Sequence, residues 1–326
     1  MKHMNDFDQI PDWPEEEDLA RVSKALSSWY VRRDGKYFEL ENLFTTLSRK
    51  DVERAGFLRI RQEFPELRSP VPVMSAAFDR VIEELHDDPE QSIPTWNGRV
   101  ECKPGEGRMI WSRGMVAVNA WEEPGYRSLR VNEADYGPFE AFLQFLFPRE
   151  PEREMVLHWL AWNLQNEGDK PGWAVFLYSQ TKGTGKSTFC RLVSKLFGEE
   201  NSATQNNLTK LTGRFNMTML RSKLVISEEL KLKAETESAN ALKTYITESV
   251  TVGEMKGREA ERVQQCCAFL FTTNHLPSWI EAGDRRLYVV EIDHEGHAAG
   301  PRADEFAALV GRVSRYFDDP AELGKL

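Results

Sequence analysis

The second half of the chain contains four short, continuous runs of apolar residues, at 173–178, 223–227, 268–273 and 287–292. Continuous apolar runs of this length are typical of strands buried on both faces of a mostly parallel sheet. Segments of helical periodicity lie between several of these runs. The pattern therefore predicts an α/β nucleotide-binding domain built on a mostly parallel sheet.

The first half of the chain mixes both periodicities in shorter segments. Apolar residues at helical spacing predict helices over 15–29, 75–86, 139–147 and 152–165. Residues 29–40, WYVRRDGKYFEL, predict a β-hairpin that turns at Asp34-Gly35. Prolines and glycines punctuate residues 87–108, so we expect a loop there with one small hairpin around Asn97-Gly98. Two domains follow: a smaller, mixed α+β and helical N-terminal domain over 1–150, and the α/β domain over 151–326.

Composition narrows the class of protein. The 326 residues carry a net charge of −10, which disfavours a broad basic surface spread over nucleic acid. The four cysteines form no CxxC pair, as is usual in a reducing cytosol. No apolar run reaches membrane-spanning length, and the N-terminus lacks a signal-peptide core. We therefore expect a cytoplasmic protein without a membrane partner.

A glycine-rich loop follows the first of the four apolar runs. Its glycines allow backbone N–H groups to turn toward anionic oxygens, while its lysine and hydroxyl suit nucleotide phosphates and Mg²⁺. An amphipathic helix ending near Gly198 follows, with its N-terminal dipole toward the phosphates. The full motif GxxxxGK[ST] has glycine where this chain has Gln180, so Gly183 is expected to supply the tight turn. The sequence predicts an ATP and Mg²⁺ site at Gly183, Thr184, Gly185, Lys186, Ser187 and Thr188.

Polar residues follow the later apolar runs. Glu228 and Glu229 end the second run, where one carboxylate can hold hydrated Mg²⁺ and the other can polarise an attacking water. Asn274 ends the third run and can orient that water or contact the terminal phosphate. Arg285 and Arg286 precede the fourth run, and an arginine there can reach a neighbouring subunit's nucleotide. Arg286 is the better placed of the two, although a surface pair with Asp284 is the alternative.

Residues 250–264, VTVGEMKGREAERVQ, predict a β-hairpin with Lys256 near its tip. Its positive and negative side chains balance, so a solvated surface hairpin is the default interpretation. In a ring, however, copies of one lysine converge on a central pore. Lys256 and Arg258 could then contact a phosphate backbone even in an acidic protein.

The order GTGKST, ISEEL, VTVGEMKGREAERVQ, FLFTTNHLP and DRRLYVVEI resembles the superfamily 3 helicases, the AAA+-like replicative helicases of small DNA viruses, phages and plasmids. The helicase half of phage and plasmid primase-helicases is the more similar group. The resemblance covers about residues 170–293 strongly and 27–165 loosely. It implies a P-loop ATPase domain at 151–326 and an accessory or oligomerisation domain at 1–150.

The resemblance also implies roles for single residues. Lys186 and Ser187 would bind phosphate and Mg²⁺, Glu228 would act on Mg²⁺ and Glu229 on the water. Asn274 would be the polar sensor, Arg286 a finger supplied in trans within a hexameric ring, and Lys256 the contact to single-stranded DNA. The family moves 3′ to 5′ along DNA, in this case in a bacterial host. No primase motif occurs in 1–150, so a separate primase is a candidate partner.

Two other classes of function stay open. One is a P-loop motor with another use, such as defence, DNA packaging or protein remodelling. The other is a regulatory nucleotide-binding module without turnover, which the Glu228–Glu229 pair disfavours. The pair His294 and His297 suggests a metal site only weakly, because it lies in a glycine-containing loop. Residues 303–317 predict an amphipathic helix packed on the ATPase core.

Overall fold

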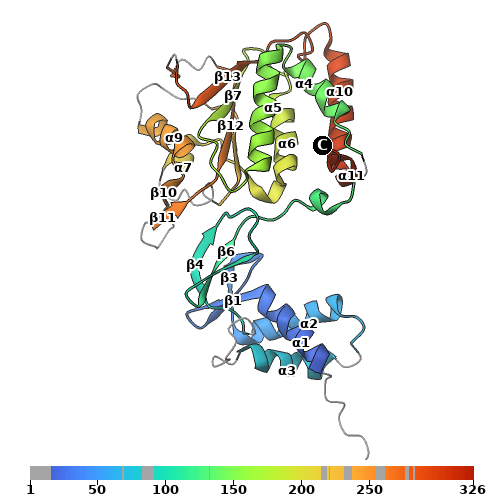
Figure 1. Cartoon of the computed structure of the whole chain (residues 1–326), viewed down its shortest axis with the longest axis vertical. Coiled ribbons are helices and arrows are strands. Elements are labelled where there is room, and N and C mark those ends of the chain that lie inside the picture. Colours follow the sequence, from blue (N-terminus) through green and yellow to red (C-terminus); the bar gives the residue numbers. More distant parts are fainter. Residues whose placement is uncertain are drawn as a thin grey trace, which may run out of the picture. The chain divides into compact units, whose positions relative to one another are not determined.

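The computed structural model describes the chain except for residues 1–15, 68–69, 83–91, 132, 214–218, 220, 231–236, 254–260, 276–278 and 282. The chain divides into two compact units. The first comprises Met1–Arg99 and Arg108–Val118, and the second comprises Val100–Gly107 and Asn119–Leu326 (Figure 1).

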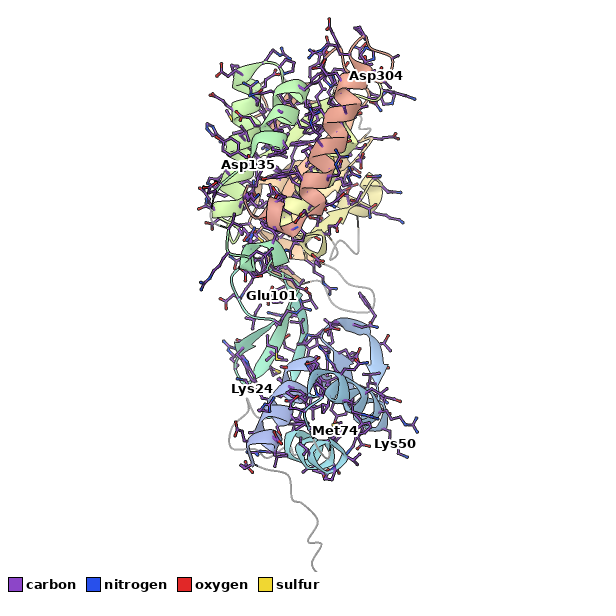
Figure 2. The ribbon with its side chains drawn as sticks, turned by 90° about the vertical axis from the view of Figure 1, so that its right-hand side faces the viewer. Lys24, Lys50, Met74, Glu101, Asp135 and Asp304 are labelled. Carbon is purple, nitrogen blue, oxygen red and sulfur yellow. The ribbon has the colours of Figure 1, made fainter. Side chains whose placement is uncertain are left out.

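The first unit combines helices with two small three-stranded sheets. Its buried core includes Val22, Leu26, Val52, Ile60 and Phe78. Met74 lies among the packed helices, whereas Lys24 and Lys50 are exposed (Figure 2). Its helices are α1 (Glu16–Trp29), α2 (Arg49–Glu63) and α3 (Pro70–Ile82). One sheet consists of β1 (Tyr30–Arg33), β2 (Lys36–Glu39) and β3 (Asn42–Leu47), in that order. The other consists of β4 (Trp96–Glu101), β6 (Met115–Asn119) and β5 (Met109–Ser112), in that order. The last residues of β4 and β6 belong to the second unit.

Two predicted turns in this unit have different outcomes. The Asp34-Gly35 hairpin is confirmed, since both residues have positive φ, 51° and 69°, as a type I′ turn requires. The hairpin predicted around Asn97-Gly98 is wrong, because β4 continues through it. The Asn97 side chain accepts the Arg99 N–H at 2.8 Å, so the Asn97-Gly98 pair is accommodated within the strand and does not reverse it. The reversal lies instead between β5 and β6.

The second unit is an α/β fold around a five-stranded parallel sheet in the order β13-β7-β12-β9-β8. The four predicted apolar strands are all present in it, and the short β8 adds an edge strand. The strands are β7 (Ala174–Tyr178), β8 (Ser202–Thr204), β9 (Leu224–Ser227), β12 (Ala268–Thr273) and β13 (Leu287–Glu291). Every residue of β7, β9 and β12 is buried, which accounts for their lack of apolar–polar alternation.

Helices cover both faces of this sheet (Figure 1). Val175 and Leu177 of β7 face one helical layer, whereas Ala174 and Phe176 face the other. The first layer consists of α4 (Gly137–Leu146), α5 (Glu150–Gln165), α6 (Lys186–Phe197) and α10 (Ala303–Asp318), and the second of α7 (Leu208–Thr212) and α9 (Glu237–Thr247). The helix α4 packs on α10 and thus belongs to the second unit, on the N-terminal side of the boundary expected at residue 150. Short helical turns occupy Gly125–Ser128, Glu199–Asn201 and α11 (Pro320–Leu323).

The predicted hairpin after α9 is present at its base. Strands β10 (Val250–Gly253) and β11 (Glu261–Gln264) pair antiparallel, with Val250 opposite Gln264 and Gly253 opposite Glu261. Lys256 and Arg258 lie outside the described residues. All four cysteines are free and buried. Within the described part of the chain, each helix is too short or too polar to cross a bilayer.

Candidate nucleotide-binding site

The glycine-rich loop connects the carboxyl end of β7 to the first turn of α6. Gly185 stands directly before the helix with φ of 87°, and Lys186 is the first helical residue. The first backbone N–H groups of a helix have no partner within the helix, and its dipole is positive at that end. The loop therefore ends in a site suited to an anion.

The loop glycines are required by close packing as well as by backbone conformation. A Cβ atom on Gly183 would lie 2.6 Å from the Cβ of Ala298, and one on Gly185 would lie 2.6 Å from Cζ of Phe306. Gly183 has φ of 74°, whereas Gln180 is not among the described residues with positive φ. The tight turn thus lies at Gly183, and the position of Gln180 has no need for glycine.

Lys186 is buried although its side chain is cationic. Only 8% of the residue is exposed, and its Nζ donates to Oγ1 of Thr184 at 3.2 Å. Burial lowers the pKa of Lys186, because removing the ammonium from water disfavours its charged form. A partly desolvated cation beside a helix N-terminus interacts strongly with an anionic ligand.

Ser187 and Glu228, the two residues predicted to hold Mg²⁺, meet at the carboxyl end of the sheet. The Ser187 hydroxyl donates to Oε2 of Glu228, joining α6 to the end of β9. The Glu228 backbone N–H in turn donates to Oδ1 of Asn206 at 2.8 Å. Hydroxyl and carboxylate oxygens are hard donors of the kind that Mg²⁺ prefers. The residues present therefore fit the ion, and Asn206 is a supporting residue that sequence reasoning missed.

Glu229 adopts a backbone conformation that side chains rarely take, with φ of 57°. The next residue anchors this turn, since the Leu230 N–H donates to the Thr272 carbonyl at 2.9 Å. Glu229 is exposed and lines the same pocket as the glycine-rich loop. The turn thus separates the two adjacent acids, so that Glu228 contacts Ser187 while Glu229 faces open space.

Asn274 follows β12, which lies between β7 and β9 in the sheet. Its side chain therefore stands between the loop and the acidic pair, and it lines the pocket with Glu229. Its Oδ1 is buried and has no hydrogen-bond partner among the described residues. A buried polar atom without a partner is costly unless a ligand or water satisfies it.

The glycine-rich loop, Ser187, Glu229 and Asn274 line one pocket of about 560 Å³. Its other wall comes from the segment after β13 and from α10, which sequence reasoning assigned to the core. These wall residues are small or apolar and lie more than 100 residues beyond the loop, so no motif identifies them. The wall consists of Gly296, Ala298, Ala303, Phe306, Ala307 and Val310. A polar floor with an apolar wall suits a ligand that combines phosphates with a nucleoside.

Arg286 lies at the opposite edge of the sheet, beside the amino end of β7, where the Ala174 N–H donates to its carbonyl at 2.8 Å. The five residues of β7 separate this edge from the loop. At ~3.3 Å per residue, the distance along the strand is about 16 Å. Arg286 is thus not brought together with Lys186, Glu228, Glu229 or Asn274 in its own chain.

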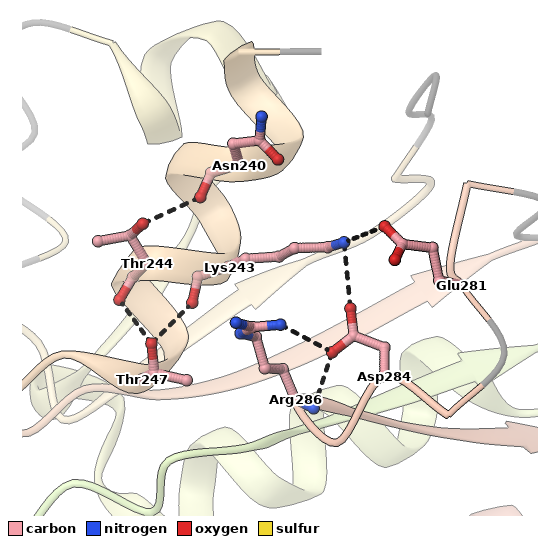
Figure 3. Close-up of polar contacts among 7 residues, drawn as sticks. All are labelled: Asn240, Lys243, Thr244, Thr247, Glu281, Asp284 and Arg286. Carbon is pink, nitrogen blue, oxygen red and sulfur yellow. Dashed lines mark hydrogen bonds and ion pairs between the residues drawn. The ribbon is translucent and has the colours of Figure 1, made fainter. Parts of the chain in front are cut away.

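Asp284 holds Arg286 in an ion cluster (Figure 3). Nη1 of Arg286 lies 3.3 Å from Oδ1 of Asp284, and Nζ of Lys243 lies 3.2 Å from Oδ2. Lys243 also pairs with Glu281 at 2.8 Å. Burial opposes ionisation of Asp284, but hydrogen bonds from the Arg286 backbone and Lys243 outweigh it and lower the pKa of Asp284. The surface pair weighed as an alternative is therefore present, and it fixes the arginine in place.

Arg285 differs from its neighbour. It is exposed and makes no hydrogen bond or ion pair with the residues that the structure describes. Arg286 is half-buried and is oriented by Asp284, since the same Oδ1 also accepts the Arg286 backbone N–H at 3.0 Å. The two arginines thus offer a free cation and a positioned one at the same sheet edge.

The fold and site define an α/β protein with a glycine-rich loop at a helix N-terminus and a pocket lined by that loop and a carboxylate. A family model described as "Family of unknown function (DUF5906)" matches residues 177–286, which include the loop, the acidic pair and Asn274. No curated protein matches the chain.

Solved structures of similar fold include "The A form apo structure of NrS-1 C terminal region-CTR", with a TM-score of 0.58 and 16% identity over 91% of this chain. This chain spans 63% of that structure's length. "The apo structure of NrS-1 C terminal region (305-718)" has a TM-score of 0.61 and 16% identity, covering 95% of this chain and 72% of the other. At this identity the likeness is one of fold.

Proposed function

We propose that the second unit is an AAA+-like P-loop ATPase and that the chain is a ring-forming DNA helicase of phage or plasmid replication. The observation that carries the proposal is the convergence of Lys186, the Ser187–Glu228 pair, Glu229 and Asn274 at one edge of a parallel sheet. The motif order that resembles superfamily 3 helicases and the similarity in fold to the NrS-1 C-terminal region support it.

The chain's own groups account for binding of ATP. The N-terminus of α6 and Lys186 attract the phosphates, and the apolar wall beside α10 accepts the nucleoside. Ser187 and Glu228 would hold Mg²⁺, which supplies charge neutralisation for the phosphates when bound. Binding by this loop is the step that Lys186 controls most directly.

Hydrolysis requires a positioned water. Glu229 makes no ion pair with the residues that the structure describes, and it lines the pocket, so its carboxylate accepts a hydrogen bond and then a proton from the water. Asn274 stands between the loop and the acidic pair, and its amide orients that water or contacts the terminal phosphate. This division of roles disfavours a regulatory module without turnover.

Coupling to DNA depends on assembly. Strands β10 and β11 follow α9 and pair as the base of a hairpin, and the sequence between them contains Lys256 and Arg258, the proposed DNA contacts. With a net charge of −10, a single chain offers little attraction to DNA, but six copies arranged as a ring bring several lysines to one strand. We therefore expect DNA binding that requires ATP-dependent assembly and that is strongly salt-sensitive.

A P-loop motor that moves duplex DNA or remodels protein is the second candidate. ATPase activity measured with and without single-stranded DNA, together with strand separation on a 3′-tailed duplex, distinguishes the two. A helicase shows stimulated ATPase and unwinding, and Lys256→Ala abolishes both. If Lys256→Ala leaves DNA binding and unwinding intact, the helicase mechanism is wrong. If Lys186→Ala still hydrolyses ATP, the nucleotide site itself is wrong.

A further inference from the structure

His294 lies between β13 and α10 and reaches back to the glycine-rich loop. Its Nε2 lies 3.1 Å from the carbonyl oxygen of Thr184, and its Nδ1 accepts the backbone N–H of Gly296 at 3.1 Å. A carbonyl can only accept a hydrogen bond, so Nε2 must carry the proton. The two contacts therefore select one tautomer of a neutral imidazole.

The surroundings of the ring favour the neutral form. The His294 ring packs edge-on against Phe145, with 5.1 Å between ring centroids. It is tilted against Phe306, with 4.8 Å between ring centroids. Burial lowers the pKa of His294, and the nearby cation Arg302 and His297 act in the same direction. The Thr184 carbonyl and Asp293 oppose this shift without reversing it. Near neutral pH the ring is thus an uncharged donor to Thr184.

The backbone around this contact has little room to move. A Cβ atom on Gly296 would lie 2.3 Å from Cε1 of Phe145, and one on Gly183 would lie 2.6 Å from the Cβ of Ala298. Glycine at 183 allows Ala298 to lie directly against the loop, and glycine at 296 allows the same segment to lie against Phe145. The loop's shape thus depends on a partner about 110 residues away in the sequence.

The contact has a consequence for the direction of one loop N–H group. The peptide bond between Thr184 and Gly185 is trans, as are all described peptide bonds. In a trans peptide the C=O and the following N–H point in opposite directions. Because the Thr184 carbonyl points to His294, the Gly185 N–H points away from His294, and both Thr184 and Gly185 line the pocket.

We propose that His294 is a positioning residue for nucleotide binding, which fixes the Thr184–Gly185 peptide so that its N–H faces the phosphates. The proposal rests on the proposed nucleotide site and adds to it a control over the loop that no loop motif encodes. It also accounts for the departure at Gln180, because the contact to Thr184 and the packing at Gly183 set the turn.

Two conservative variants separate this contact from the local turn. In His294→Gln the amide nitrogen occupies roughly the place of Nε2 and can still donate to Thr184. In His294→Asn the shorter side chain can accept the Gly296 N–H but cannot reach Thr184. His297→Ala is the matched control, because His297 contacts only the nearby Ala299 N–H, at 3.3 Å, among the described hydrogen bonds of its ring.

The test is calorimetric titration of the full chain with ATP and Mg²⁺, with amide hydrogen exchange of residues 180–186 measured in the same variants. We expect ATP binding about fivefold weaker in His294→Asn, near wild type in His294→Gln and unchanged in His297→Ala, as for loss of one buried hydrogen bond. Loop exchange without ATP should rise in His294→Asn alone. Exchange reports on the loop even where binding is weak.

The outcomes keep this inference apart from the proposed function. If Lys186→Ala binds ATP like wild type, the nucleotide site fails. If Lys186→Ala abolishes binding while His294→Asn binds normally with unchanged exchange, only the role of His294 fails. If His294→Gln and His294→Asn are weakened equally, the ring acts through its packing against Phe145 and Phe306, and the positioning role is likewise overturned.

Discussion

The two edges of the five-stranded sheet carry different chemistry. At the carboxyl edge, Lys186, Glu229 and Asn274 surround one pocket with the glycine-rich loop. At the amino edge, Asp284 holds Arg286 together with Lys243 of α9 (Figure 3). The length of β7, about 16 Å, separates the two sets. In the proposed function, an arginine so placed would act on the nucleotide of another copy of the chain.

This separation is what the proposed ring would require. In the proposed function, the carboxyl edge would bind a nucleotide with its own residues, whereas the amino edge holds the cation Arg286 in place through Asp284. If neighbouring chains pack edge to edge, each pocket gains the charge that its own chain cannot supply. Mutations at the two edges should therefore have separable effects on ATP binding and ATP hydrolysis.

Lys186→Ala should have the largest effect. Lys182 and Lys186 are the two cationic residues among the described residues that line the pocket, and Lys186 is the buried one. ATP hydrolysis should fall to background and ATP binding should become undetectable by calorimetry. Lys182→Ala, at an exposed neighbouring position, is the control and should retain binding. If Lys186→Ala still binds ATP, the nucleotide does not bind at the carboxyl edge as proposed.

Arg286→Ala should lower kcat by about 1,000-fold, the lower range for loss of an arginine finger, while ATP binding stays within about twofold. Arg285→Ala is the matched control, since Arg285 is exposed and has no described partner. Steady-state hydrolysis and calorimetry on both variants make the comparison. If Arg285→Ala is the inactive variant, the exposed Arg285, and not Arg286, is the arginine finger.

Glu229→Gln should slow hydrolysis by about 100-fold without loss of ATP binding, as for removal of a general base. Glu228→Gln should instead weaken the Mg²⁺ dependence of binding, because Glu228 contacts Ser187. Titrations with and without Mg²⁺, alongside kinetics, separate the two carboxylates. Equal behaviour of both variants would contradict the division of roles that the Glu229 turn implies.

Asp284→Asn should have a smaller effect, about tenfold on kcat, because Arg286 persists but loses its orienting charge. The variant should also be less stable than wild type at neutral pH. The pKa of Asp284 is lowered below 3.8 in the folded state, so its contribution is present above pH 3.8 and is lost as the pH falls through the folded pKa. Melting temperatures of wild type and variant should therefore converge in acid, and a constant difference would exclude this charge effect.

Part of this picture could be predicted from sequence because it rests on local patterns. The buried strands appear as continuous apolar runs, and the parallel sheet brings the residues after each run to one edge. That rule predicts the meeting of Ser187 with Glu228 and the position of Asn274. The base of the hairpin β10–β11 was predictable from its alternating valines.

Other parts depend on contacts that no local pattern records. Asn206 supports Glu228 from a polar stretch 22 residues earlier, and His294 reaches Thr184 across 110 residues. Phe306 and Val310 follow helical periodicity, so the sequence assigns them to the core, yet they also line the pocket. The Asn97-Gly98 pair suggests a turn, but tertiary pairing with β6 keeps it within β4.

The most direct test of the central claim is ATP hydrolysis by mixed assemblies of Lys186→Ala and Arg286→Ala chains. Each variant alone lacks one half of every site. In a mixture, an Arg286→Ala chain keeps its own Lys186 and can receive Arg286 from a Lys186→Ala neighbour. The account predicts that mixing two inactive proteins restores hydrolysis with single-stranded DNA present. A mixture that assembles into common rings but stays as inactive as its parts would contradict it.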